Sequence, residues 1–336
     1  MFRSRFLTAF DRAGIASTRN RQTSMTKNST GLRDIRRLTT KVFLAQRRDH
    51  VLLKVRRALK LPETMTVGAT ELTLSPGHTL TMNQRHHVLY DRFLPHLAAR
   101  LKPNSMVIDV GANCGDTLGA MHATNPTLGF IAIEPHDEYF ALLERNVARL
   151  KAKSPFEVHL VKRMVSCSAG VMTLVQSGGT ARAVHDPDAP AGAATQKLDE
   201  IVEAAAVTSV RLLKSDVDGF DFDVLNSAQS VLARMQPVVF FESQIDYEFQ
   251  RIAFAEMLSM LEGHGYNFWV LFDNFGSVVL RTSSRDAVAQ LIDYTWKKRH
   301  QTPWRTINYF DVLAVTQADR DFANEVVDSY ETLSVA

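Results

Sequence analysis

Residues 105–134 read SMVIDVGANCGDTLGAMHATNPTLGFIAIE, and this stretch decides the fold. The apolar run MVIDV contains one acid, Asp109, and is followed by glycine, which predicts a buried strand. The glycine turn Gly111–Gly115 leads into a helix that ends at the Asn-Pro pair of residues 125–126. A second apolar run, LGFIAI, ends at Glu134. Strand, glycine turn, helix, strand and acid form the first half of a nucleotide-binding βαβ unit.

The side chains in the turn indicate which nucleotide binds. A dinucleotide site needs G-x-G-x-x-G, but counting from Gly111 the second glycine slot holds Asn113 and the third holds Asp116. An aspartate at a helix N-terminus would repel a pyrophosphate docked there. S-adenosylmethionine carries an ammonium and a sulfonium and no phosphate, so acidic side chains suit it. The alternative is a structural turn in an unrelated α/β protein.

The same stretch supplies most of the predicted cofactor contacts. Glycines let the backbone approach a ligand closely, and an acid about 20 residues further on can hold a ribose diol. We therefore expect the adenosine to lie between the glycine turn and the acid after the second strand. The cofactor-binding residues predicted here are Asp109, Gly111, Asn113, Gly115, Asp116 and Glu134.

Composition is that of an ordinary globular protein. The 336 residues are 45% hydrophobic and 22% charged, which is enough to bury a full core. Only two cysteines occur, Cys114 and Cys167, so neither a disulfide framework nor a zinc site is indicated. No apolar run approaches the roughly 18 residues of a membrane span. These features predict a cytoplasmic protein.

The net charge of +3 conceals a strongly basic N-terminus. Residues 1–60 hold sixteen Lys and Arg against three Asp, a net charge of +13, so the rest of the chain carries −10. This segment suits a transit peptide to an organelle, a basic arm making peripheral contact with an anionic membrane or RNA, or a tail preceding a later start at Met25. Residues 35–59 have loosely helical spacing and predict one or two amphipathic helices.

Residues 61–104 lead into the core. Alternation over residues 64–82 predicts a β-hairpin with its turn at Ser75-Pro76-Gly77, and residues 86–101 have helical spacing. His86 and His87 lie at the predicted start of this helix. They are candidates for facing a substrate, although such a pair more often caps a helix or lies on the surface.

A second informative stretch, VRLLKSDVDGFDFD, covers residues 210–223. Its strand ends at Asp216 and Asp218, and ligands of open α/β sheets bind beyond the carboxyl ends of the strands. The later run PVVFFE predicts a fifth strand ending at Glu242. Each acid terminates an apolar strand, so the strand ends form an acidic rim matched to a sulfonium.

These acids supply the predicted catalytic groups. Asp216 is the first candidate for a base, with Asp218 or a histidine (His86 or His87) behind it. Asp216 is also a predicted cofactor-binding residue. The cluster of Asp216, Asp218 and Asp221 could hold Mg²⁺. However, no histidine or asparagine joins it at a convincing spacing, so the sequence predicts no metal site.

The remaining elements are predicted from periodicity and turn residues. Residues 177–194 are rich in Gly, Ala and Pro and predict a flexible loop or lid. Helices are predicted over residues 222–232 and 247–261. Residues 283–305 form an insertion whose basic and aromatic side chains could grip a phosphorylated sugar or anchor a solvated helix.

Four motifs in order resemble the FkbM family of S-adenosylmethionine-dependent methyltransferases. They are VIDVGANCGDT at residues 107–117, the acid Glu134, KSDVDGFD at residues 214–221 and PVVFFE at residues 237–242. The similarity covers roughly residues 106–242. Asp218 and Asp221 stand where the family usually has glutamate, which shortens their reach by one methylene.

The resemblance implies a doubly wound, mostly parallel, seven-stranded Rossmann-like methyltransferase sheet whose last strand is antiparallel. It places Ser166 in the loop that faces the adenine. The implied organisation is a basic extension over 1–60, a hairpin and helix over 61–104, a methyltransferase domain over 105–318 and a tail over 319–336.

The implied activity is O-methylation of a hydroxyl on a small molecule, sugar or glycan, with S-adenosylmethionine as donor and no nucleic-acid partner. Two alternatives stay open. One is an NAD-dependent oxidoreductase on the same sheet. The other is an inactive binding module recruited through the basic N-terminus.

Overall fold

The computed structural model describes residues 45, 47–167, 172–177, 180–185, 195–299 and 307–334. The chain divides into two units, Met1–Arg47 and Arg48–Ala336, and the second contains the sheet and the site. Residues 47–58 are helical, as predicted, whereas the rest of the basic N-terminus lies outside the described residues. In the described part of the chain, every helix is too short or too polar to cross a bilayer.

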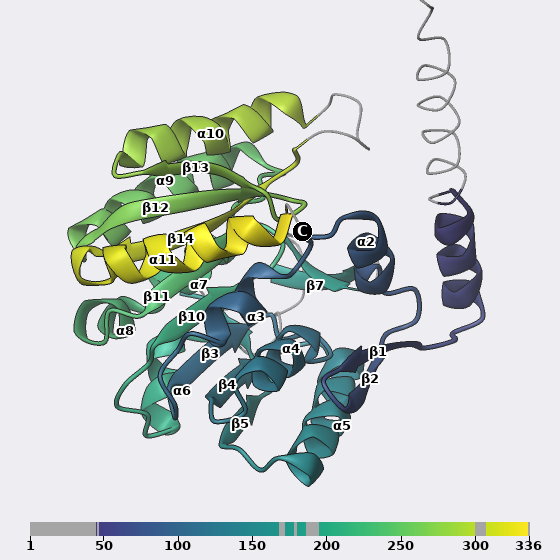
Figure 1. Cartoon of the computed structure of the whole chain (residues 1–336). Coiled ribbons are helices and arrows are strands. Elements are labelled where there is room, and N and C mark those ends of the chain that lie inside the picture. The colour runs from purple at the N-terminus through teal and green to yellow at the C-terminus, as the bar shows by residue number, and fades with distance from the viewer. Residues whose placement is uncertain are drawn as a thin grey trace, which may run out of the picture. The chain divides into compact units, whose positions relative to one another are not determined.

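Five neighbouring parallel strands form one side of the main sheet, from β11 to the edge strand β5 (Figure 1). They are β3 (Met106–Val110), β4 (Gly129–Ile133), β5 (Val158–Val161), β10 (Leu212–Ser215) and β11 (Val238–Glu242). Every residue of β3, β4, β10 and β11 is buried, as expected for strands covered on both faces. The order of strands reverses between β3 and β10, so the carboxyl ends of these two strands flank the crevice where ligands of such sheets bind.

Three further strands extend the sheet beyond β11. The antiparallel strand β14 (Phe310–Thr316) lies between β11 and β12 (Tyr266–Asp273), and β13 (Val278–Thr282) adds the edge. The full order is β13-β12-β14-β11-β10-β3-β4-β5. The main sheet therefore has eight strands where seven were expected, because the chain after β12 turns back as a hairpin before it enters the last central strand.

Helices cover both faces of the sheet and bury two apolar cores. One face carries α6 (Leu198–Ala204), α7 (Asp221–Asn226), α8 (Gln229–Arg234), α9 (Glu248–Gly263) and α10 (Arg285–Lys298). The other carries α3 (Phe93–Ala98), α4 (Asp116–Thr124), α5 (Asp137–Lys153) and α11 (Arg320–Glu331). Within β3, Ile108 packs into the first core and Val107 into the second, which follows from the two-residue period of a strand.

The predicted hairpin exists, but its turn was placed wrongly. Strands β1 (Glu63–Val67) and β2 (Thr70–Leu74) pair through a turn at Gly68, and the Ser-Pro-Gly sequence instead precedes α2 (Leu80–His86). The predicted helix over residues 86–101 is shorter, because residues 87–92 are not helical. Buried Asn146 of α5 ties this hairpin to the glycine turn, since its side chain bonds both backbone groups of Thr73 and donates to Cys114 O.

Two other expectations need correction. The predicted flexible segment over residues 177–194 contains a strand, β8 (Thr180–His185), which pairs with β7 (Met172–Ser177) as a hairpin; residues 186–194 lie outside the description. The predicted helix over 222–232 is two short helices, because α7 ends at Asn226 and α8 begins at Gln229. The short strands β6 (Met164–Val165) and β9 (Thr195–Gln196), which precede and follow this hairpin in the sequence, pair with each other in parallel.

Candidate active site

The glycine turn after β3 holds left-handed backbone conformations. Gly111 and Gly115 have φ of +75° and +80°, and Asn113 between them has φ of 48°. A Cβ on Gly111 would lie 2.0 Å from the backbone oxygen of Asp216, and one on Gly115 would lie 2.8 Å from Leu143 Cδ1. Glycine is therefore required at both positions by conformation and by space. At Gly111 the two loops that leave β3 and β10 are in direct contact.

Glu134 holds the turn from the end of β4. Its Oε2 accepts the Asn113 N–H at 2.9 Å and its Oε1 accepts the His136 N–H at 2.8 Å. Burial raises the pKa of Glu134 to about 7, even though both backbone donors favour the charged form. Each carboxylate oxygen can accept a further hydrogen bond, so Glu134 remains able to receive hydroxyl groups from the cavity that it lines.

Asp109 and Lys214 form a buried ion pair behind the turn. Lys214 Nζ lies 2.9 Å from Asp109 Oδ1 and donates to Gly111 O at 2.9 Å. Burial alone would lower the pKa of Lys214, but the negative charges of Asp109 and Asp216 raise it above its ordinary value. Burial raises the pKa of Asp109, and Lys214 opposes that shift. The structure thus places Asp109, a predicted cofactor contact, beneath the glycine turn, where it does not line the cavity.

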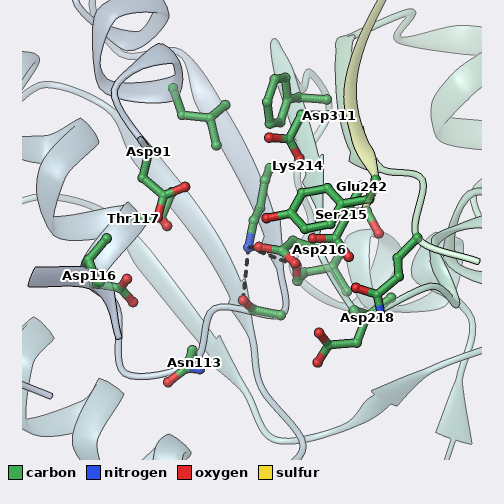
Figure 2. Close-up of a pocket in the computed structure, with 18 of the residues that line it drawn as sticks. Asp91, Asn113, Asp116, Thr117, Lys214, Ser215, Asp216, Asp218, Glu242 and Asp311 are labelled. Carbon is green, nitrogen blue, oxygen red and sulfur yellow. Dashed lines mark hydrogen bonds and ion pairs between the residues drawn. The ribbon is translucent and has the colours of Figure 1, made fainter. Parts of the chain in front are cut away.

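A cavity of about 260 Å³ lies over the carboxyl ends of the central strands. Its lining contains Lys214 and Arg163 as cations and is otherwise strongly acidic. Figure 2 shows Lys214 between two groups of carboxylates, with Asp91 and Asp116 on one side and Asp216 on the other. The carboxylates of the described residues that line the cavity are Asp91, Asp116, Glu134, Asp216, Asp218, Glu242 and Asp311.

The two aspartates predicted as catalytic groups both line this cavity. The side chain of Asp216 is 52% exposed, and its Oδ2 lies 3.7 Å from Lys214 Nζ. Asp218 follows in a left-handed conformation with φ of 52°, and Gly219 continues the tight turn with φ of 91°. The chain after β10 therefore directs two carboxylates into the space beyond the strand ends. Asp221, the third aspartate of this motif, is buried away from the cavity and accepts the Ser215 hydroxyl at 2.6 Å.

Besides Asp109, three predicted site residues lie outside the cavity lining, namely His86, Ser166 and Gly115. The imidazole of His86, a predicted catalytic group, is 3.1 Å from Asp49 Oδ2 of the preceding helix. Ser166, predicted to face the adenine, is 2% exposed, and its side chain hydrogen-bonds Asp223. Both interactions hold local structure together, so the geometry does not support a catalytic role for His86 or a cofactor contact for Ser166.

The other predicted cofactor residues meet at one place. Gly111, Asn113 and Asp116 line the cavity together with Glu134, and Asp116 begins α4. The Asp116 carboxylate accepts a hydrogen bond from the Cys114 thiol across 3.8 Å. These four residues therefore lie around one cavity, and their contact with the cofactor stays a prediction.

Two acidic residues of the lining, Asp91 and Asp311, were missed by the sequence analysis. Asp91 follows the α2 helix in a stretch that was assigned to a helix, and its positive φ of 53° gave no sequence signal because the residue is not glycine. Burial and the charges of Asp116 and Asp216 raise the pKa of Asp91 to about 7. Asp311 did leave a signal, because it is an acid inside the apolar run FDVLAVT of β14.

One group of three possible metal ligands occurs among the described residues, namely His78, Cys114 and Asp116, with their ligand atoms within 4.8 Å of one another. His78 Nδ1 accepts the Leu80 N–H at 3.3 Å, and Cys114 bonds Asp116. Both contacts are local, the first at the start of α2 and the second within the glycine turn.

The site fits S-adenosylmethionine by its charge and by its backbone. The donor has a net positive charge, and the lining offers carboxylates on both sides of the glycine turn. Asp116 in the first turn of α4 opposes a pyrophosphate at that helix end, and it suits an ammonium. The mostly parallel sheet with β14 inserted antiparallel, together with this acidic turn, defines the Rossmann-like class of S-adenosylmethionine-dependent methyltransferases.

Comparison with known families identifies the domain. Residues 109–268 match the family model of the methyltransferase FkbM domain. The protein is therefore an S-adenosylmethionine-dependent methyltransferase that carries an FkbM domain, as its four motifs predicted. This match decides against the NAD-dependent oxidoreductase. No curated protein sequence matches the chain.

Distant similarity to solved structures is confined to the fold. An S-adenosylmethionine-dependent methyltransferase from Agrobacterium tumefaciens matches with a TM-score of 0.44 and 10% identity, over 76% of this chain and 70% of that chain. The fibrillarin pre-rRNA processing protein of Methanococcus jannaschii matches with a TM-score of 0.39 and 10% identity, over 76% and 83%. The precorrin-6y C5,15-methyltransferase of Geobacter metallireducens GS-15 matches with a TM-score of 0.36 and 12% identity, over 67% and 87%.

Proposed function

We propose that the enzyme methylates a hydroxyl group of a small molecule or sugar. The observation that carries this proposal is the position of Asp216 and Asp218, which follow β10 and line the cavity across Lys214 from Asp91 and Asp116 (Figure 2). A hydroxyl becomes a good nucleophile only as it loses its proton, so a base must lie within hydrogen-bond reach of it. Asp216 is the proposed base, because its half-exposed carboxylate faces the cavity.

The donor supplies an activated methyl group, and the chain supplies position and charge. Glu134 and the glycine turn hold the donor side, and the residues that follow β10 and β11 bound the opposite side. Alignment of two bound reactants can contribute effective molarities of about 10⁵–10⁸ M. Lys214 holds Asp216 at the strand end through their 3.7 Å contact. The methyl carbon would form a bond to the acceptor oxygen as its bond to the donor sulfur breaks, so that S-adenosylhomocysteine leaves and the hydroxyl proton passes to Asp216.

The experiment is product analysis with donor carrying a ¹³C-methyl group. Acceptors are screened as matched alcohols, amines and carboxylates, and the ¹³C shift of the product identifies a methoxy, N-methyl or ester group. The proposal expects methoxy products, and N-methyl or ester products alone would refute it. Asp216→Asn should lower kcat by about 10²–10⁴-fold, the usual contribution of a general base. The matched Asp199→Asn change, on α6 and outside the cavity lining, should leave kcat unchanged.

Peripheral contact of the basic residues 1–60 with an anionic membrane is a separate prediction. Removal of this basic segment should reduce binding to anionic vesicles while leaving methyl transfer to a small acceptor intact. Equal vesicle binding with and without the segment would refute it. The same truncation, compared by fluorescence in cells, tests the predicted cytoplasmic location against organelle targeting.

A further inference from the structure

Two carboxylates face each other on adjacent strands at the acceptor side of the cavity. Glu242 at the end of β11 is directly opposite Asp311 of β14 in the antiparallel register. Residues that are directly opposite in such a pair point to the same face, and like charges there destabilise the sheet. Both side chains line the cavity (Figure 2). A natural sheet that keeps this pair at its centre needs a compensating charge or proton.

Among the residues that the structure describes, no group supplies that charge. Glu242 is only 7% exposed, and its Oε1 has no hydrogen-bond partner within the described ranges. No ion pair of the described residues includes either Glu242 or Asp311, because Lys214 is held by Asp109 and Gly111 O. A buried carboxylate oxygen without a partner is costly, so its burial at the cavity wall points to a ligand that satisfies it.

The charge balance of the cavity leads to the same conclusion. Seven carboxylates and two cations line it among the described residues, and the donor brings a single net positive charge. Burial and the charges of neighbouring carboxylates raise the pKa of Glu242 and of Asp311 well above the ordinary range. A bound cation would oppose these shifts, because a nearby positive charge favours the charged form of a carboxylate.

We propose that Glu242 and Asp311 bind an ammonium group of the methyl acceptor. The acceptor is then an amino alcohol or amino sugar, with its ammonium at this pair and its hydroxyl near Asp216. This inference rests on the proposed methylation of a hydroxyl, but it assigns a different part of the acceptor. Tyr90 and Tyr309 also line the cavity, and aromatic rings favour an organic cation.

The aromatic lining also favours an organic cation over a metal ion. A metal site needs several ligand atoms around one point, and among the described residues that arrangement occurs only at His78, Cys114 and Asp116. Glu242 and Asp311 provide two carboxylates beside apolar rings. An ammonium can satisfy both carboxylates through its three N–H donors and contact the rings at the same time.

The test uses two probes of the same shape that differ in charge, 4-fluorobenzylamine and 4-fluorobenzyl alcohol. Each is titrated by ¹⁹F NMR into the full chain saturated with S-adenosylhomocysteine. The ammonium probe should bind at least about tenfold more tightly, as expected from one hydrogen bond to a charged group. Glu242→Gln and, independently, Asp311→Asn should remove this preference. Glu256→Gln, the same change at an exposed position of α9, should retain it.

Equal binding of the two probes, or no binding of the ammonium probe, would overturn the proposal. So would retention of the preference in both Glu242→Gln and Asp311→Asn, with unchanged affinity for S-adenosylhomocysteine showing that these variants are folded. Displacement of the ammonium probe by millimolar MgCl₂ would overturn it in favour of a metal site. Because the probes report binding alone, an N-methylated product in the screen would refute the proposed hydroxyl chemistry while leaving this ammonium site intact.

Discussion

The two sides of the cavity satisfy their carboxylates in different ways. On the donor side, Glu134 receives two backbone N–H groups and Asp109 receives Lys214, so each acid has a partner from the chain. On the acceptor side, Glu242 and Asp311 oppose each other and no group of the described residues pairs with them. The donor side is therefore organised before the ligand binds, whereas the acceptor side is completed by its ligand. Variants that remove a partner should lower the free energy of unfolding strongly on the donor side. On the acceptor side, removal of one of the two carboxylates should change it little.

The largest effect is expected for Lys214→Met. The change leaves Asp109 buried without a partner, and breaking a buried pair in this way costs about 3–5 kcal/mol of unfolding free energy. Urea denaturation measures the loss. The double variant Lys214→Met/Asp109→Asn should recover much of it, and Lys151→Met, at an exposed position of α5, should stay within about 0.5 kcal/mol of wild type. A double variant as unstable as the single one would contradict this account of the donor side.

Gly111→Ala should cause the next largest loss of unfolding free energy. The left-handed conformation alone costs an alanine about 1–2 kcal/mol, and its Cβ would also meet the Asp216 oxygen at 2.0 Å. We expect at least about 2 kcal/mol of destabilisation together with loss of S-adenosylhomocysteine binding in calorimetry. The matched control is Gly263→Ala at the end of α9, where a Cβ meets nothing within 4 Å.

That control should be neutral or stabilising by about 0.5–1 kcal/mol, because alanine restricts the unfolded chain. Similar losses at Gly111 and Gly263 would show that the close contact between the two loops does not matter.

Glu134→Gln should have a smaller effect than the two preceding variants, because it removes only one hydrogen-bond acceptor on the donor side. Glutamine has one oxygen, so one of the Asn113 and His136 N–H groups would face an NH₂ group and lose its acceptor. A buried donor left unsatisfied costs about 1–3 kcal/mol. We expect S-adenosylhomocysteine affinity to fall about 10- to 100-fold, again by calorimetry. Affinity equal to that of Glu256→Gln would mean that Glu134 does not shape the donor site.

On the acceptor side, the buried carboxyl group of Glu242 should make the free energy of unfolding depend on pH. Burial and neighbouring carboxylates raise the pKa of Glu242 above its unfolded value of about 4.5, so the folded protein binds an extra proton above that pH. Stability contributed by this proton is complete below the unfolded pKa and is lost as pH rises toward the folded pKa. Without ligand, wild type should therefore lose up to about 1.4 kcal/mol per pH unit relative to Glu242→Gln above pH 4.5.

Urea denaturation between pH 4 and 8 measures this difference. Asp311, which faces Glu242, and the nearby Asp216, Asp218 and Asp221 are present in both proteins, so the difference reports the titration of Glu242 together with its effect on theirs. A constant difference between wild type and Glu242→Gln across this range would show that Glu242 titrates normally.

Sequence reasoning located the donor side better than the acceptor side, for physical reasons. The donor side is built from contiguous residues, and the left-handed turn around Gly111 requires glycine, which is visible as a letter. The acceptor side depends on the pairing of β11 with β14, two strands that are about 70 residues apart in the sequence. The acid in FDVLAVT was visible, but its position opposite Glu242 follows only from the register. His86 was misleading because its partner, Asp49, lies in an earlier helix.

The contact between Gly111 and the Asp216 backbone has a consequence for the order of events. The glycine turn after β3 would contact the donor, and the turn after β10 carries the proposed base. These two loops cannot move independently, and Lys214 contacts both. Donor binding that orders the glycine turn would thereby position the Asp216 carboxylate. Acceptors should therefore bind productively only after the donor. Kinetics of an ordered pattern, with the donor first, would be the signature of this mechanical link.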